Sequence, residues 1–251
     1  MTTKKRPKTF NIGIPLYPGF DPLDVIGPFE VFTWMSYIWQ KRKVQVLLVG
    51  AADADTEKPA PSTSFSGMTI LPQHTFDDCP PLDVIFVPGG DAGGVKTTMT
   101  DEAYQAFLKR QGKKAGYVSS VCTGALIVAS SGLLDGYQAT THWSLVPCLN
   151  LFPKVKVVNG YPRYVVDRNR VTGGGISSGL DEALHMTALI TGDTHIAKRV
   201  QLSIQYNPHP PFNDGDPYNA EYSVYEDTHV AFKDYIGELC KAIREVVGNS
   251  Q

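Results

Sequence analysis

Residues 117–136 read YVSSVCTGALIVASSGLLDG, a sequence that changes from strand-like to helix-like at Cys122. Residues 116–121 (GYVSSV) form a short apolar run, typical of a strand buried on both faces of a parallel sheet. Residues 123–134 are small and aliphatic and end among glycines, which predicts a helix. The strand runs directly into the helix, so Cys122 is expected on the turn between them. Open α/β sheets bind ligands at such strand ends.

The same alternation of strand and helix occurs earlier in the chain. Apolar runs at 10–17 (FNIGIPLY), 43–51 (KVQVLLVGA) and 82–90 (LDVIFVPGG) predict further buried strands. Helical spacing of apolar residues follows the first run, and Thr100 or Asp101 is expected to cap a helix that ends near Gln111. This order predicts an α/β fold with a parallel sheet, helices on both sides and right-handed crossovers.

The second half of the chain continues this pattern with one exposed interruption. A hairpin turn is expected at 167–169, and the glycines at 173–175 form a tight turn before a helix capped by Ser177 or Ser178. Asp193 is expected to cap the next helix. Residues 207–221 are rich in Pro, Gly, Asn and Asp and predict an extended surface segment, and the spacing of apolar residues beyond it predicts an amphipathic helix.

Composition narrows the class of protein. The chain has 251 residues, is 42% hydrophobic and carries a net charge of −2, which fits one domain at 10–251 behind a flexible basic tail at 1–9. The short basic clusters do not form a surface for nucleic acid. No apolar run approaches the roughly 20 residues of a membrane span, and no apolar stretch follows the basic N-terminus. We therefore expect a cytoplasmic protein that binds neither nucleic acid nor membrane.

The four cysteines are scattered, without a CxxC pair or a histidine at metal-ligand spacing. A disulfide and a zinc site are not expected, and Cys79, Cys148 and Cys240 are interpreted as packing residues. Cys122 differs because Ser120 and Gly124 flank it, and small residues are what a sharp strand-to-helix elbow requires. The following helix is expected to lower the pKa of the Cys122 thiol through its dipole.

An oxyanion pocket and an acid-base partner are expected beside this cysteine. The amides of Thr123 and Gly90 could bind developing negative charge. Asp24 is the acid-base candidate because it lies in the apolar stretch LDVIGP, where lost solvation keeps a carboxyl group protonated to higher pH. The alternative for Asp24 is a helix cap, a role that Asp21 could equally fill. His142, in TTHW, is interpreted as a structural histidine, and Glu30 lies farther along the chain.

These motifs resemble a known family. The segments VIFVPGG (84–90), SVCTGALIVASSGLLDG (120–136), ATTHW (139–143) and LDVIGPFEVF (23–32) are similar to the ThiJ/PfpI superfamily, whose fold is flavodoxin-like and related to class I glutamine amidotransferases. The resemblance covers about 10–206. RVTGGGISSGLDEAL (170–184) and QL-x-x-QY-x-P-x-PPF (201–212) narrow it to the isonitrile hydratases within that superfamily.

The resemblance implies hydration of a small apolar isonitrile by water to an N-substituted formamide, in a homodimer with neither cofactor nor metal. Cys122 would attack the isonitrile carbon while Asp24 supplies a proton, giving a thioimidate that water opens. Thr123 would assist, and Gly90 with Thr123 would correspond to the amide pocket. Proteases of the superfamily have a histidine directly after the cysteine, and Thr123 at that place argues against protease activity.

Two other functions remain open. A glutathione-independent glyoxalase would use the same cysteine and acid on a dicarbonyl. A non-enzymatic domain would sense a ligand, like the module fused to AraC-type regulators, or oxidation of the exposed thiol. The aromatic residues Phe32, Trp34, Tyr37, Trp39 and Phe212 either line an apolar pocket or belong to the core.

Overall fold

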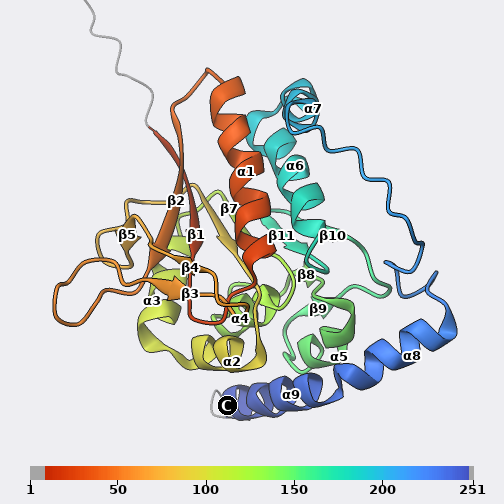
Figure 1. Ribbon diagram of the computed structural model, residues 1–251. Coiled ribbons are helices and arrows are strands. Elements are labelled where there is room, and N and C mark those ends of the chain that lie inside the picture. The colour runs from red at the N-terminus through yellow and green to blue at the C-terminus, as the bar shows by residue number, and fades with distance from the viewer. Residues whose placement is uncertain (1–8, 249–251) are drawn as a thin grey trace, which may run out of the picture.

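The structure is a computed structural model that describes residues 9–248 (Figure 1). Its centre is a seven-stranded sheet with the order β10-β11-β7-β6-β1-β2-β5. The strands of this sheet are β1 (Phe10–Pro15), β2 (Val44–Gly50), β5 (His74–Thr75), β6 (Val84–Val87), β7 (Tyr117–Ser120), β10 (Tyr164–Asp167) and β11 (Arg170–Gly173). Two small two-stranded sheets pair β3 (Ser62–Thr63) with β4 (Thr69–Ile70) and β8 (Gln138–Ala139) with β9 (Lys156–Val157).

Neighbouring strands of the large sheet run parallel except β10, which pairs antiparallel with β11 through the predicted hairpin. Every residue of β1 and β6 is buried, as expected for strands covered on both faces. The chain builds outward from β1 in one direction through β2 and then in the other through β6, β7 and β11. This reversal between β1 and β6 is the switch point at which doubly wound sheets form a ligand crevice.

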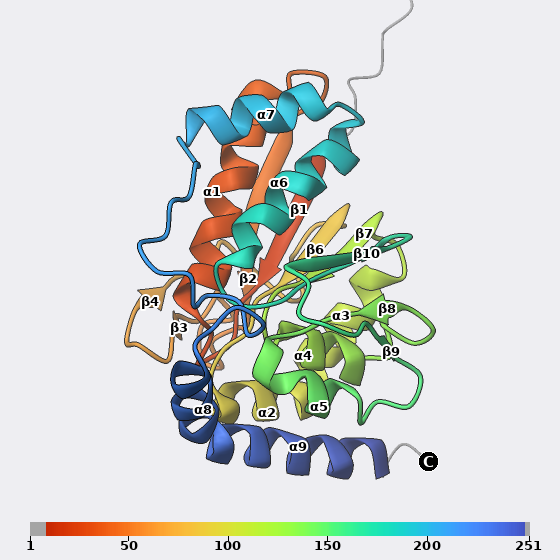
Figure 2. The same ribbon diagram turned by 90° about the vertical axis from the view of Figure 1, so that its right-hand side faces the viewer.

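Helices cover both faces of the sheet (Figures 1 and 2). On one side α1 (Pro22–Ile38), α6 (Ser178–Thr191) and α7 (Thr194–Ser203) pack together. On the other side lie α2 (Ala92–Thr100), α3 (Glu102–Gly112), α4 (Gly124–Ser130), α5 (Val146–Leu149), the short 3-10 helix at Trp143–Leu145, and α9 (Lys233–Gly248), which packs against α2, α4 and α5. α8 (Tyr222–Ala231) precedes α9. The predicted flavodoxin-like α/β sandwich is confirmed.

Helix ends agree with the sequence where a capping side chain is present. Asp101 and Asp193 cap α3 and α7 as predicted. The helix α2 was not predicted, because Gly93, Gly94 and several threonines give it low helix propensity, although Asp91 caps it. α4 is shorter than expected. The prediction of one C-terminal helix is wrong, because the structure has two helices there: α8 ends at Ala231 and α9 begins at Lys233.

The five aromatic residues singled out in the sequence do not share one pocket. Phe32 and Trp39 are buried in the core, whereas Tyr37 is 67% and Phe212 79% exposed. Trp34 is only partly buried, and its indole donates a hydrogen bond to the side chain of Glu30. For Phe32 and Trp39 the core interpretation is therefore correct.

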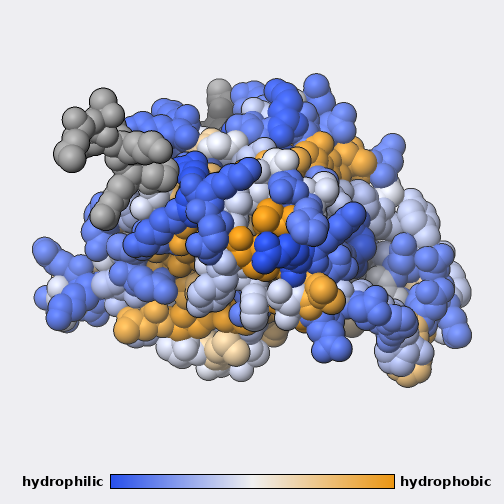
Figure 3. Space-filling view, turned by 90° about the horizontal axis from the view of Figure 1, so that it is seen from above, coloured by the Kyte–Doolittle hydropathy of each residue, from blue (hydrophilic) through white to orange (hydrophobic). Residues whose placement is uncertain are grey.

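Among residues 9–248 no helix is long and apolar enough to cross a bilayer. Seen from above, the molecule presents mainly hydrophilic residues, with hydrophobic residues in smaller groups between them (Figure 3). The predicted basic tail lies, apart from Thr9, outside the described residues, and the division of the chain at residue 10 stays a prediction.

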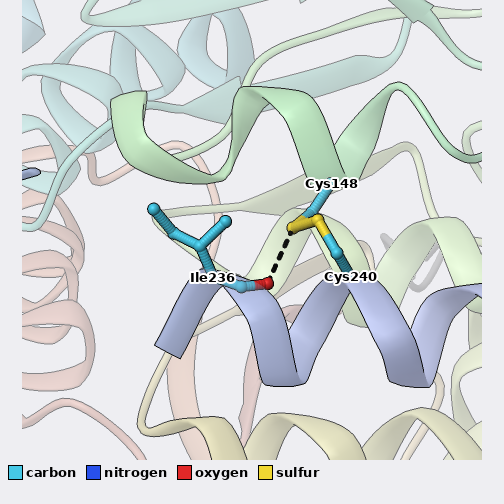
Figure 4. Close-up of a disulfide and its surroundings, with 3 residues drawn as sticks. All are labelled: Cys148, Ile236 and Cys240. Atoms are coloured by element: carbon cyan, nitrogen blue, oxygen red, sulfur yellow. Dashed lines mark hydrogen bonds between the residues drawn. A yellow bond between two sulfur atoms is a disulfide. The ribbon is translucent and has the colours of Figure 1, made fainter. Parts of the chain in front are cut away.

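A disulfide joins Cys148 in α5 to Cys240 in α9, which corrects the expectation of two packing cysteines (Figure 4). The cysteines are 92 residues apart, and their Cα atoms lie 4.8 Å from each other. No local spacing in the sequence could indicate this pair, because only the packing of α9 on α5 brings the two together. Cys79 and Cys122 are free.

Breaking this disulfide should destabilise the protein, because a cross-link over a loop of this length restricts the unfolded chain. We expect Cys148→Ala with Cys240→Ala to lower the free energy of unfolding by about 2–4 kcal/mol, and the melting temperature by roughly 5–15 °C. Cys79→Ala is the control for loss of a buried sulfur without a cross-link. Equal melting temperatures for the double variant and this control, measured without reductant, would contradict the assignment.

Candidate active site

Three strand ends meet at the switch point of the sheet. The loop after β1 leads into the first turn of α1 and Asp24, the segment after β6 supplies Gly89 and Gly90, and the turn after β7 supplies Cys122. β1, β6 and β7 are neighbours in the sheet and run parallel, so their carboxyl ends lie at one edge. The residues predicted from separate parts of the sequence are thereby brought together.

Cys122 has the backbone of a nucleophile elbow. Its φ is +56°, a left-handed conformation that is strained for a residue with a side chain, at about 1–3 kcal/mol. The Cys122 amide donates a hydrogen bond to the carbonyl of Gly173 (3.2 Å), and its carbonyl accepts one from the Thr141 hydroxyl (2.8 Å). These contacts fix the turn from both sides. The residue is 7% exposed, so the thiol lies at a sheltered strand end.

Asp24 and Asp21 have separate roles. Asp21 is the N-cap of α1 and accepts hydrogen bonds from the amides of Leu23 and Asp24. Asp24 is fully buried, and its Oδ2 accepts a hydrogen bond from the Gly89 amide (2.9 Å) while its Oδ1 has no partner in the structure. Since Asp21 provides the cap, the Asp24 side chain is left for another purpose.

The two glycines after β6 allow Asp24 and Thr123 to lie close to the backbone of that segment. A Cβ on Gly89 would lie 2.6 Å from the Thr123 hydroxyl oxygen, 2.7 Å from the Thr123 amide and 2.9 Å from Oδ2 of Asp24. The Gly90 amide donates a hydrogen bond to the hydroxyl oxygen of Thr123 (3.0 Å). The amide predicted to form an oxyanion pocket thus engages Thr123 here, and its role toward a substrate stays a prediction.

Burial is the largest influence on the pKa values of Asp24 and Cys122. It raises the pKa of the Asp24 carboxyl, and the nearby charge of Asp21 raises it further. Burial also raises the pKa of the Cys122 thiol well above its usual value, followed by the negative charge of Asp24, while hydrogen bonds from the Thr123 amide and hydroxyl lower it. The expected fall in the thiol pKa is therefore wrong in net direction, because α4 has only seven residues and burial outweighs its dipole.

Sequence reasoning missed two residues at or behind this site. The Tyr235 hydroxyl, from α9, donates a hydrogen bond to the Gly90 carbonyl (2.7 Å) across 145 residues of chain. Glu182 of α6 is fully buried and accepts a hydrogen bond from the Ser119 hydroxyl; burial raises its pKa, and the charge of Asp24 adds to this. The one available signal was a glutamate among apolar residues of a helix.

His142 is structural, as predicted. Its Nδ1 lies 2.8 Å from the Ser144 hydroxyl, and its ring packs against Phe232. Burial lowers the His142 pKa to about 4, so the ring is neutral near pH 7. Over residues 9–248, no three His, Cys, Asp or Glu side chains gather closely enough to hold a metal ion.

The fold and site together define an α/β protein with a cysteine on a nucleophile elbow and a buried carboxyl group beside it. The DJ-1/PfpI family model matches residues 11–188, and the chain belongs to this family. It is 42% identical over 220 residues to an isonitrile hydratase of Pseudomonas putida, covering 86% of this chain and 87% of that protein.

Further relatives extend the comparison. A ThiJ/PfpI family protein of Pseudomonas syringae superposes with a TM-score of 0.82 at 33% identity, covering 94% of this chain and 91% of that structure. Drosophila melanogaster DJ-1beta shares the fold, with a TM-score of 0.67 at 19% identity, covering 80% of this chain and all of that structure. The transcriptional regulator GbdR of Pseudomonas aeruginosa is 33% identical over 121 residues, which are 48% of this chain and 32% of that protein.

The close approach at Gly89 can be tested by adding one methyl group. Gly89→Ala should displace Thr123 and Asp24 and lower the melting temperature by an amount equivalent to about 1–3 kcal/mol, because a backbone amide cannot move aside easily. It should also change the pH profile of Cys122 alkylation by iodoacetamide. Gly93→Ala is the matched control, since its Cβ meets nothing nearer than 3.5 Å. Identical behaviour of the two variants would contradict this geometry.

Proposed function

We propose that this protein is an isonitrile hydratase, which adds water to a small apolar isonitrile and releases an N-substituted formamide. The similarity to the Pseudomonas putida isonitrile hydratase over most of both chains supports the substrate class. The observation that carries the chemistry is the buried carboxyl group of Asp24, held at Gly89 and close enough to raise the pKa of the Cys122 thiol. Such a pair can move one proton between acid and nucleophile.

In the first step the sulfur of Cys122 forms a bond to the terminal carbon of the isonitrile. The pair holds one proton, and the step begins when this proton passes from the Cys122 thiol to the Asp24 carboxylate, which leaves a thiolate beside a protonated Asp24. The carboxyl group gives its proton to the same carbon as the C–S bond forms, leaving a thioimidate and a carboxylate. The raised pKa of Asp24 suits it to be the acid, because a carboxyl group with an ordinary pKa would be ionised near pH 7.

In the second step water opens the thioimidate. The Asp24 carboxylate takes a proton from water as the oxygen bonds to the carbon, and this proton passes to the nitrogen. The hydroxyl proton then returns to Asp24 as the C–O double bond forms and the C–S bond breaks, which releases the formamide and restores the starting pair. Thr123, with its amide and hydroxyl at the sulfur, stabilises the departing thiolate. We assign Gly90 to the same pocket through its contact with Thr123.

The two alternative functions, a glyoxalase and a sensor domain, have less support. The glyoxalase hypothesis uses the same residues, but the similarity to an isonitrile hydratase favours the hydratase. The sensor reading draws on the match to GbdR, yet the matched region is only about a third of that regulator and about half of this chain.

One assay separates these functions. Purified protein is incubated with an alkyl isonitrile or with methylglyoxal, and products are identified by NMR. We expect formamide from the isonitrile, no turnover in Cys122→Ala, and a loss of about 10²-fold or more in Asp24→Asn, because the acid-base group is removed. Conversion of methylglyoxal alone would favour the glyoxalase, and consumption of neither compound the sensor.

Thiol reactivity supplies a control for Asp24→Asn. Removing the negative charge should lower the pKa of Cys122, so alkylation by iodoacetamide at pH 8 should become faster while hydration becomes slower. A damaged fold would not produce a more reactive thiol together with an unchanged melting temperature. If formamide forms undiminished in this variant, the assigned acid-base role is wrong.

We also propose a homodimer, in which α1 contacts a second copy. Leu23 and Ile26 on α1 are 42% and 43% exposed, and Ile176, just before the neighbouring helix α6, is 37% exposed. Light scattering should give twice the mass of one chain. Leu23→Glu with Ile26→Glu should halve it, because burying charge at such a contact is unfavourable. Leu202→Glu, at a position 80% exposed on α7, should leave it unchanged; a monomeric unmodified protein would contradict the dimer.

The cytoplasmic location stays a prediction. The Cys148–Cys240 disulfide argues against this location, because disulfides persist in oxidising compartments and are rare in a reducing cytosol.

A further inference from the structure

Tyr235 brings a phenol hydroxyl to the site from outside the region matched by the family model. The family match ends at residue 188, whereas Tyr235 lies in α9 at Lys233–Gly248. Its hydroxyl donates to the Gly90 carbonyl at 2.7 Å. Burial raises the pKa of Tyr235 and the charge of Cys122 raises it further, whereas a side-chain hydrogen bond with Thr123 lowers it and the charge of Asp24 raises it again. The phenol therefore keeps its proton, and it lies close to all three side chains. None of the steps above uses this residue.

The Gly90 carbonyl competes with the sulfur for one hydrogen atom. The Thr123 hydroxyl has a single hydrogen to donate, and its oxygen lies 3.3 Å from the Gly90 carbonyl oxygen. A hydrogen bond from the same hydroxyl to the Cys122 thiol would lower the thiol pKa, so the carbonyl and the sulfur are alternative acceptors for this hydrogen. The Tyr235 hydroxyl donates to the same carbonyl at the shorter distance of 2.7 Å. A carbonyl already engaged by a short hydrogen bond is a weaker acceptor for a second donor, so the Thr123 hydrogen is left for the sulfur.

We propose that Tyr235 is a positioning residue, whose hydroxyl satisfies the Gly90 carbonyl and thereby directs the Thr123 hydroxyl toward the sulfur of Cys122. The hydrogen bond from Thr123 stabilises the thiolate that attacks and later departs. The consequence for turnover rests on the proposed hydratase function, whereas the consequence for the thiol itself does not.

The C-terminal helix is anchored firmly enough for this role. Leu239 and Ile243 of α9 are fully buried, and Cys240 forms the disulfide to α5. The ring of Phe232 packs against the rings of Tyr235 and His142, with ring centroids 6.0 Å and 5.6 Å apart. Packing and a covalent link therefore hold the phenol in place, rather than its single hydrogen bond alone.

The test is a double-mutant cycle between Tyr235→Phe and Thr123→Val, made in a Cys79→Ala background so that Cys122 is the one free thiol. The rate of iodoacetamide alkylation is measured from pH 6 to 11. Tyr235→Phe should raise the pKa of Cys122 and slow alkylation below that pKa about tenfold, which corresponds to about 1.4 kcal/mol, the size of one hydrogen bond. With Thr123→Val already present, Tyr235→Phe should change the rate less than twofold, because no hydroxyl remains to be directed.

Tyr222→Phe is the matched control, since that tyrosine lies on α8 and is 79% exposed; it should change neither pKa nor rate. If Tyr235→Phe has no effect on the Cys122 pKa, or has the same effect with and without the Thr123 hydroxyl, the proposal is overturned. Isonitrile hydration should show a fall in kcat of about tenfold with KM nearly unchanged. An unmodified protein that hydrates no isonitrile would refute the hydratase function, and the alkylation cycle would still decide the role of Tyr235.

Discussion

The burial of the Asp24 carboxyl group beside the Cys122 thiol is the constraint on which the site depends. Removing a carboxylate from water is unfavourable by several kcal/mol, and one amide hydrogen bond from Gly89 offsets only part of this. The orphaned Oδ1 adds to the deficit. The carboxyl group therefore retains a proton to higher pH than a solvated one, and a buried thiol next to it does the same. The burial that would weaken an ordinary core thus favours the protonated carboxyl group, which is the form that the proposed acid requires.

Backbone geometry makes this burial possible, and the sequence shows most of it. Buried parallel strands lack the usual alternation and appear as apolar runs, so β1, β2, β6 and β7 could be predicted, as could the elbow at Cys122. The helix α2 could not, because its glycines and threonines resemble a loop and it is held by packing rather than by propensity. The division of the C-terminal segment into α8 and α9 could not be predicted either, because the helical spacing of apolar residues continues across the break.

The site could be predicted as far as it follows from strand ends. The residues after β1, β6 and β7 converge whatever the details of packing, so Asp24, Gly89, Gly90 and Cys122 could be placed near one another from the sequence. The direction of the thiol pKa could not be predicted, because burial is a property of the packed molecule. Tyr235 contacts a residue 145 positions away, and the two cysteines of the disulfide are 92 positions apart. Such distant contacts leave no local pattern in the sequence.

A second carboxyl group, that of Glu182, is buried in the same part of the molecule and adds to the energetic cost of the site. Glu182 lies behind the elbow, and its pKa, like that of Asp24, is raised in the folded protein. Between the ordinary pKa of a carboxyl group, about 4, and these raised values, the folded protein binds more protons than the unfolded chain. Stability therefore falls as pH rises through that range, the reverse of the behaviour of a carboxylate in an ion pair. The large apolar core and the disulfide between α5 and α9 offset the unfavourable burial of these two carboxyl groups.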